Sequence, residues 1–193
     1  MTWTNLFLIK LSPDNIINDT ASGYSKYYTI PKSNRFVVPG ESEKKNRDWS
    51  ILGKNSLKQI TLRDKLMIVA HGGVDNVATK NYEDLALALY NWGLREVGLI
   101  TFKCCLVGRS DFLEQFVRYV GPDDTIKIGW VKGYRGPAIL NYRLSTGKPH
   151  EEIRNDTASG SKSGASRYKI VAGIHAFSVP NSRYIVHEQD DDK

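Results

Sequence analysis

The chain has 193 residues, of which 40% are hydrophobic and 25% charged, and its net charge is +6 at neutral pH. This length and composition suit one folded domain and exclude a disordered chain, a collagen and a coiled coil. The positive charge is concentrated in the C-terminal half, which is typical either of a solvated basic face or of a site for a polyanion.

The cysteines and the apolar runs indicate the environment of the chain. Its two cysteines, Cys104 and Cys105, are adjacent, and adjacent residues rarely form a disulfide. We therefore expect no disulfide framework and a reducing cytosol as the place of action. We expect neither a signal peptide nor a membrane span, since no run reaches about 20 apolar residues. No spacing of cysteine and histidine indicates a zinc or other metal site.

The N-terminal third predicts short strands. Residues 6–11 form an apolar run that predicts a first strand, and 13–15 interrupt it. Residues 24–30 and 35–38 are rich in β-forming types and predict a hairpin that turns at 31–34.

Three further apolar runs predict strands buried on both faces, as in a parallel sheet, at 65–70, 97–102 and 125–131. Between them, residues 81–94 predict a helix with Asn81 at its N-terminus, and Ser110 is expected to cap a second helix that ends at 120. This alternation predicts an α/β fold with a central, mostly parallel sheet flanked by helices.

The last third is expected to be different. Residues 1–137 predict the α/β core, and 138–193 a β-rich basic extension within the same compact domain. The hexapeptide Asn-Asp-Thr-Ala-Ser-Gly occurs at 18–23 and at 155–160, and we expect two similar loops. The expected strands of the extension are 139–144, 168–171 and 184–187.

Nucleophilic chemistry is indicated at the strand ends. His71 follows the strand at 65–70, and Cys104 and Cys105 follow the strand at 97–102. Chemistry in parallel sheets gathers at the carboxyl ends of strands, so we expect a Cys-His site there. The N–H groups of Gly72 and Cys105 are expected to stabilise an oxyanion, and the helix at Ser110 to favour a thiolate.

These segments resemble the caspase-like (clan CD) cysteine peptidases. The similarity is carried by Leu-Met-Ile-Val-Ala-His-Gly-Gly at 66–73 and by Leu-Ile-Thr-Phe-Lys-Cys-Cys-Leu-Val-Gly at 99–108. It is nearest to the self-cleaving protease domains of bacterial toxins and to the clostripain-like and CHAT peptidases. The resemblance implies a caspase-like fold with a C-terminal β-rich subdomain.

The resemblance also assigns roles to the Cys-His residues. It implies that His71 is the general base and acid. Cys105 is preferred as the nucleophile because the small Cys104 precedes it, as a small residue precedes the nucleophile in the clan. Cys104 remains the alternative nucleophile.

Further site residues are expected on the same resemblance. Trp130 and Tyr134, within 129–137, are expected to line the substrate pocket, and Asp75 to contribute to specificity. The β-rich extension implies inositol hexakisphosphate, or another polyanion, as an activator that the chemistry itself does not require. The residues expected to bind it are Lys148, Arg154, Lys162, Arg167 and Lys169.

The expected function is therefore a cysteine endopeptidase acting on a protein substrate, of the kind found in a bacterial toxin or effector that works in a host cytosol. Two alternatives stay open. One is a nonenzymatic module with the same fold that binds a polyanion or a protein, with nucleic acid not expected as the partner. The other is a Cys-His acyltransferase or deamidase, which an ordered Asp or Asn partner of His71 would favour.

Overall fold

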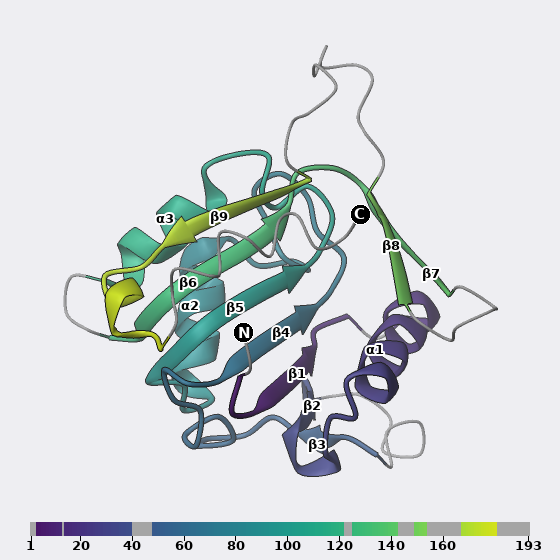
Figure 1. The fold of residues 1–193 in the computed structure, drawn as a ribbon, viewed down its shortest axis with the longest axis horizontal. Coiled ribbons are helices and arrows are strands. Elements are labelled where there is room, and N and C mark those ends of the chain that lie inside the picture. Colours follow the sequence, from purple (N-terminus) through teal and green to yellow (C-terminus); the bar gives the residue numbers. More distant parts are fainter. Residues whose placement is uncertain are drawn as a thin grey trace.

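The computed structural model describes residues 3–12, 14–39, 48–121, 125–142, 149–153 and 167–180. Within these ranges the strands of the central sheet are β1 (Leu6–Lys10), β2 (Arg35–Val37), β3 (Ser50–Ile51), β4 (Lys65–Val69), β5 (Glu96–Lys103), β6 (Lys127–Tyr134) and β9 (Tyr168–Ala172). Their order across the sheet is β3-β2-β1-β4-β5-β6-β9 (Figure 1). All neighbours are parallel except β6 and β9, which are antiparallel. The predicted α/β fold with a mostly parallel sheet is confirmed.

Three helices cover the two faces of this sheet in the part of the chain described. They are α1 (Asn15–Tyr27), α2 (Tyr82–Asn91) and α3 (Phe112–Val120). In Figure 1, α2 and α3 lie behind the sheet, and α1 lies on its other side beside β1 and β4. The alternation of side chains along β4 follows this layering: Ile68 packs in the core of α2 and α3, whereas Met67 and Val69 pack against α1.

Helix α1 corrects the expectation for the N-terminal third. Residues 24–27 are helical rather than extended, and the first copy of the hexapeptide, 18–23, lies inside α1 and is not a loop. Ile17, Ala21 and Tyr24 are buried at helical spacing against β1 and β4, and this burial outweighs the β propensity of the tyrosines. The predicted hairpin is also wrong, because β2 pairs in parallel with β1.

Both predicted helices are present, but only the first begins with the predicted cap residue. Asn81 caps α2, since its Oδ1 accepts a hydrogen bond of 2.8 Å from the N–H of Asp84, as expected. Helix α3 begins at Phe112, so Ser110 lies before the helix and not at its cap position. Its hydroxyl instead accepts from the N–H of Phe112 at 3.3 Å.

The last third contributes to two sheets. β9 joins the central sheet as the antiparallel neighbour of β6, while β7 (Ala138–Tyr142) and β8 (Pro149–Ile153) pair with each other. The predicted strand at 184–187 and the second hexapeptide at 155–160 lie outside the described residues. Where the chain is described, no helix is long and apolar enough to cross a bilayer.

Candidate active site

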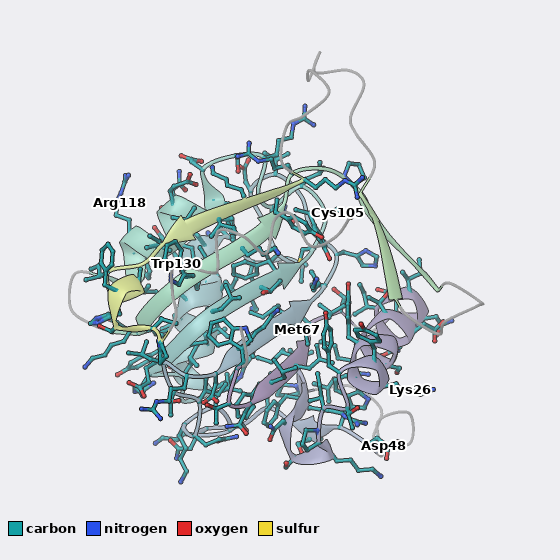
Figure 2. The ribbon with its side chains drawn as sticks, viewed as in Figure 1. Lys26, Asp48, Met67, Cys105, Arg118 and Trp130 are labelled. Atoms are coloured by element: carbon teal, nitrogen blue, oxygen red, sulfur yellow. The ribbon has the colours of Figure 1, made fainter. Side chains whose placement is uncertain are left out.

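The carboxyl ends of β4 and β5 bring the predicted histidine and cysteines to one edge of the sheet. The last paired residues of these parallel strands are Val69 and Lys103. His71 and Cys105 each lie two residues beyond that pair, so both follow directly from the same edge of the sheet. Figure 2 shows Cys105 at this end of the sheet.

Burial separates the two cysteines. Cys104 continues the buried alternation of Ile100 and Phe102, is 1% exposed, and directs its thiol to the carbonyl oxygen of Ile68 at 3.7 Å. This burial raises the pKa of the Cys104 thiol well above its ordinary range, so it stays protonated at neutral pH. Cys105 is partly exposed. Neither forms a disulfide.

Gly72 packs directly against the cysteine pair. A Cβ built on Gly72 would lie 2.8 Å from Cβ of Cys104 and 2.8 Å from the carbonyl oxygen of Cys105, with the Cys105 nitrogen at 3.3 Å. Real Cβ atoms do not approach so closely, so only glycine lets these two segments meet. The backbone that follows His71 therefore touches the backbone of Cys105. The roles of the Gly72 and Cys105 N–H groups as oxyanion donors stay predictions.

His71 contacts the carboxylate of Asp14, a residue that the sequence pattern did not single out as part of the site. Nε2 of His71 lies 2.7 Å from Oδ2 of Asp14, and the backbone N–H of His71 donates to Oγ of Ser12 at 3.3 Å. Asp14 is also the N-cap of α1, because its Oδ1 accepts from the N–H of Ile17 at 3.0 Å. One side chain thus fixes both the start of α1 and the ring of His71.

The electrostatics of this pair keep Asp14 ionised. Partial desolvation raises the pKa of Asp14, but the hydrogen bond from Ile17 and the hydrogen bond and charge of His71 together lower it by more, so the pKa lies below its ordinary value. An ionised carboxylate only accepts hydrogen bonds, so Nε2 of His71 must carry the proton. Nδ1 then holds the lone pair in the neutral ring and can exchange a proton.

A signal for Asp14 is present in the sequence. Aspartate directly before a helix is typical of an N-cap, but without the helix in view the segment 13–15 indicates only the end of a strand. β1 pairs with β4, with Lys10 opposite Val69, so the residues after β1 reach the same edge as His71.

The predicted pocket residues Trp130, Tyr134 and Asp75 do not all lie at the end of the sheet that carries Cys105. Tyr134 ends β6, is buried, and places its hydroxyl 3.4 Å from that of Tyr24. Trp130 lies four residues earlier in β6, opposite Leu99, and Figure 2 shows it well apart from Cys105. Asp75 is exposed in the turn that follows His71, where the N–H of Gly73 donates to the carbonyl of Asn76.

Two of the five predicted polyanion-binding residues, Arg167 and Lys169, lie in the part of the chain that the structure describes. Lys169 forms an ion pair with Glu114, with 2.6 Å between Nζ and Oε1. Arg167 is exposed directly before β9, and its carbonyl accepts a hydrogen bond from the N–H of Arg135. The other three expected residues, Lys148, Arg154 and Lys162, lie outside the described part. Among the residues that can be placed, no group of three or more His, Cys, Asp or Glu side chains could hold a metal ion.

No protein-family model, no curated protein sequence and no solved structure matches the chain. The site offers a partly exposed thiol, an imidazole at the same edge of the sheet, and a carboxylate that orients the imidazole.

Proposed function

We propose that the protein is a cysteine endopeptidase in which Cys105 is the nucleophile and His71 the general base and acid. The observation that carries this proposal is the contact of Gly72, the residue after His71, with the Cys105 backbone at the ends of the paired strands β4 and β5. The caspase-like architecture belongs to the same proposal. It is supported by the order of a strand followed by His-Gly, a helix, and a strand followed by cysteine.

In the proposed reaction His71 accepts a proton twice and donates a proton twice. Nδ1 of His71 takes the proton of the Cys105 thiol, and the thiolate adds to the carbonyl carbon of the scissile peptide. The carbonyl electron pair moves to oxygen, held by the N–H groups of Gly72 and Cys105. When the C–N bond breaks, His71 returns the proton to the leaving amine. Water, deprotonated by His71, then hydrolyses the thioester and restores the thiol.

Asp14 has a supporting role in this mechanism. It does not touch the substrate. Its carboxylate holds Nε2–H of His71, which keeps the lone pair on Nδ1 and stabilises the imidazolium that forms. The carboxylate is 40% exposed and the imidazole 57% exposed, so this stabilisation is screened by solvent and its main effect is orientation.

The Asp14 contact also favours a second candidate, a Cys-His-Asp acyltransferase or deamidase. Such an enzyme would form the same thioester from a side-chain amide, for example that of glutamine, and release ammonia rather than a new peptide N-terminus. Both candidate enzymes would use the same Cys105, His71 and Asp14 side chains, so only the identity of the leaving group distinguishes them.

The setting follows from the resemblance and is proposed with it. The substrate is a protein in a reducing cytosol, where both thiols persist, and the enzyme belongs to a bacterial toxin or effector. Activation by inositol hexakisphosphate gains no support from Lys169, which is engaged by Glu114.

The test uses a peptide library prepared by digesting a cell lysate. The wild-type protein is expected to create new peptide N-termini, detected by amine labelling and mass spectrometry, and Cys105→Ala and His71→Ala are expected to create none. Ammonia release without new N-termini would select the second candidate. If Cys105→Ala behaves as the wild type in both assays, the enzymatic proposals fail and a binding module remains.

A further inference from the structure

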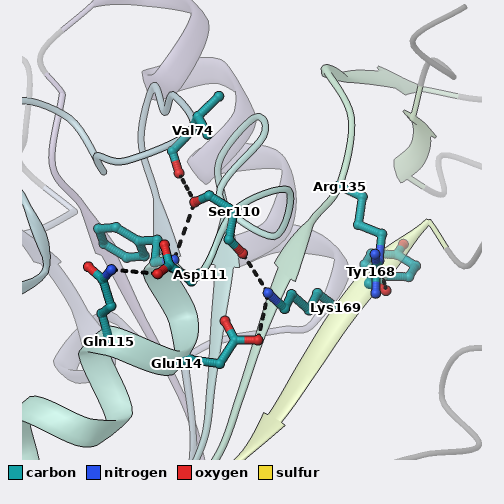
Figure 3. A network of polar contacts seen from close by, with 9 residues as sticks. Val74, Ser110, Asp111, Glu114, Gln115, Arg135, Tyr168 and Lys169 are labelled. Atoms are coloured by element: carbon teal, nitrogen blue, oxygen red, sulfur yellow. Dashed lines mark hydrogen bonds and ion pairs between the residues drawn. The ribbon is translucent and has the colours of Figure 1, made fainter. Parts of the chain in front are cut away.

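The loop that follows Cys105 is fastened to the loop that follows His71 by one side chain. Oγ of Ser110 donates a hydrogen bond of 2.5 Å to the carbonyl oxygen of Val74, and it accepts from the N–H of Phe112. Val74 belongs to the tight turn just after His71. Ser110 thus links the two strand-end segments that carry the proposed nucleophile and base (Figure 3).

Strand β9 holds this link from the other side. Nζ of Lys169 donates to the carbonyl oxygen of Ser110 at 2.5 Å and pairs with Glu114 of α3 at 2.6 Å. The Lys169 side chain is only 19% exposed, so these contacts are shielded from solvent more than a surface ion pair is. Lys169 therefore joins the edge strand, helix α3 and the loop of Cys105 at one point, as Figure 3 shows.

The same loop adopts a backbone shape that needs such support. Leu106, directly after Cys105, has a φ of 62°, a left-handed conformation that a branched residue adopts only when its surroundings impose it. Two backbone contacts fix the inner part of the loop to the end of β6. The N–H of Leu106 donates to Gly136, and the N–H of Gly108 donates to Tyr134.

We propose that Ser110 and Lys169 are positioning residues of the active site, which hold the Cys105 loop at a fixed place relative to His71. This inference rests on the proposed Cys105–His71 chemistry. Backbone bonds anchor the loop to β6, whereas the Ser110 hydroxyl sets its position against the His71 side. Neither residue touches substrate in this role. Loss of the link lets the thiol drift from the imidazole, and displacements of about 1 Å can cost a hundredfold in rate.

The experiment measures the rate at which iodoacetamide alkylates Cys105 at pH 6.5, located by tandem mass spectrometry so that Cys104 is scored separately. The rate is expected to fall roughly tenfold in Ser110→Ala and to recover in Ser110→Thr, which restores a hydroxyl. Lys169→Met leaves the Ser110 hydroxyl in place and is expected to give an intermediate fall, which Lys169→Arg reverses. Far-UV circular dichroism checks that each variant is folded.

Two controls separate positioning from a general loss of stability. Gln115→Ala removes a hydrogen bond to Asp111 of 2.6 Å beside the network, and Ser33→Ala removes an exposed hydroxyl bond far from it. Both are expected to keep the wild-type rate. A wild-type rate in folded Ser110→Ala and Lys169→Met overturns the inference. His71→Ala distinguishes failure of the positioning role from failure of the proposed function. If His71→Ala slows alkylation while Ser110→Ala does not, only the positioning role fails. If neither substitution slows alkylation, the proposed function fails as well.

Discussion

At the scale of single residues, adjacent cysteines have opposite environments because strand side chains alternate. Cys104 lies on the same side of the chain as Ile100 and Phe102 and packs in the core. Cys105, at the next position, lies on the other side and is partly exposed. The preference for Cys105 as nucleophile was based on the small residue before it. The burial of Cys104 supports the same choice for a physical reason, because a buried thiol whose pKa is raised is a poor source of thiolate.

Native alkylation should therefore distinguish the two thiols. Iodoacetamide is expected to modify Cys105 in the folded protein and to leave Cys104 unmodified, because Cys104 is both buried and protonated. In about 6 M guanidinium chloride, where the core is exposed, both should react. Tandem mass spectrometry of the peptide that contains both residues gives the site. Equal modification of Cys104 under native conditions would be inconsistent with its placement in the core.

Asp14 has two separable roles, and two substitutions separate them. Asp14→Ala removes both the α1 cap and the partner of His71, and the loss of the cap should cost about 1 kcal/mol of unfolding free energy. Asp14→Asn keeps a capping oxygen but offers an N–H to Nε2 of His71, which favours the other tautomer. We expect Asn to restore most of the stability, measured by urea unfolding, while activity on the peptide library stays about a hundredfold or more below wild type.

The pH dependence of the Asp14 contribution follows from its lowered pKa. A carboxyl whose pKa is lower when folded contributes stability above its unfolded-state pKa of about 3.9 and loses it as pH falls through the folded value. The stability gap between wild type and Asp14→Asn should therefore shrink as the pH falls below about 4, where the carboxylate becomes protonated. A gap that widens below about pH 4 has the wrong sign for this contact.

At the scale of elements, the strands were easier to predict than helix α1. β4 and β5 are buried on both faces, so they appear in the sequence as continuous apolar runs, and α2 carries a recognisable cap at Asn81. α1 buries a narrow stripe whose hydrophobic residues are Ile17, Ala21 and Tyr24. Its tyrosines and serines favoured strand and loop interpretations. Its helical form depends on packing against β1 and β4, which local sequence does not reveal.

The segment after β4 can contact the segment after β5 only because residue 72 is a glycine. Substitution of this glycine by alanine tests the contact. In Gly72→Ala the new methyl would overlap Cys104 and the Cys105 carbonyl, so the His71 segment must move away. We expect a loss of roughly 1–3 kcal/mol in unfolding free energy and a loss of activity larger than that destabilisation explains.

Gly53→Ala is the matched control for Gly72. A Cβ at Gly53 would meet only Oγ of Ser56, at 4.0 Å, so stability should change by less than about 0.5 kcal/mol and activity should be unchanged. If Gly72→Ala were as harmless as Gly53→Ala in urea unfolding and in the library assay, the close contact of the two strand ends would be refuted.

At the scale of the whole molecule, sheet topology assembles the site from segments far apart in sequence. The chain crosses from β1 to β2, returns to the other side of β1 with β4, and continues through β5 and β6. This order places the residues after β1, β4 and β5 at one edge, so Asp14 joins His71 and Cys105. The pairing of β4 with β5 could be expected from the alternation of strand and helix. The pairing of β1 with β4 could not be expected, because 54 residues (11–64) separate Lys10 at the end of β1 from Lys65 at the start of β4, and nothing local specifies that contact.

The central claim is that Cys105 and His71 act as one unit. The most direct measurement is the rate of new N-terminus formation on the peptide library by Cys105→Ala, His71→Ala and the double variant. For two residues of one catalytic unit, each single substitution should cost about as much as both together, so all three rates should fall to the same residual level. A single variant that retains wild-type activity, or losses from the two substitutions that simply multiply, would contradict the account.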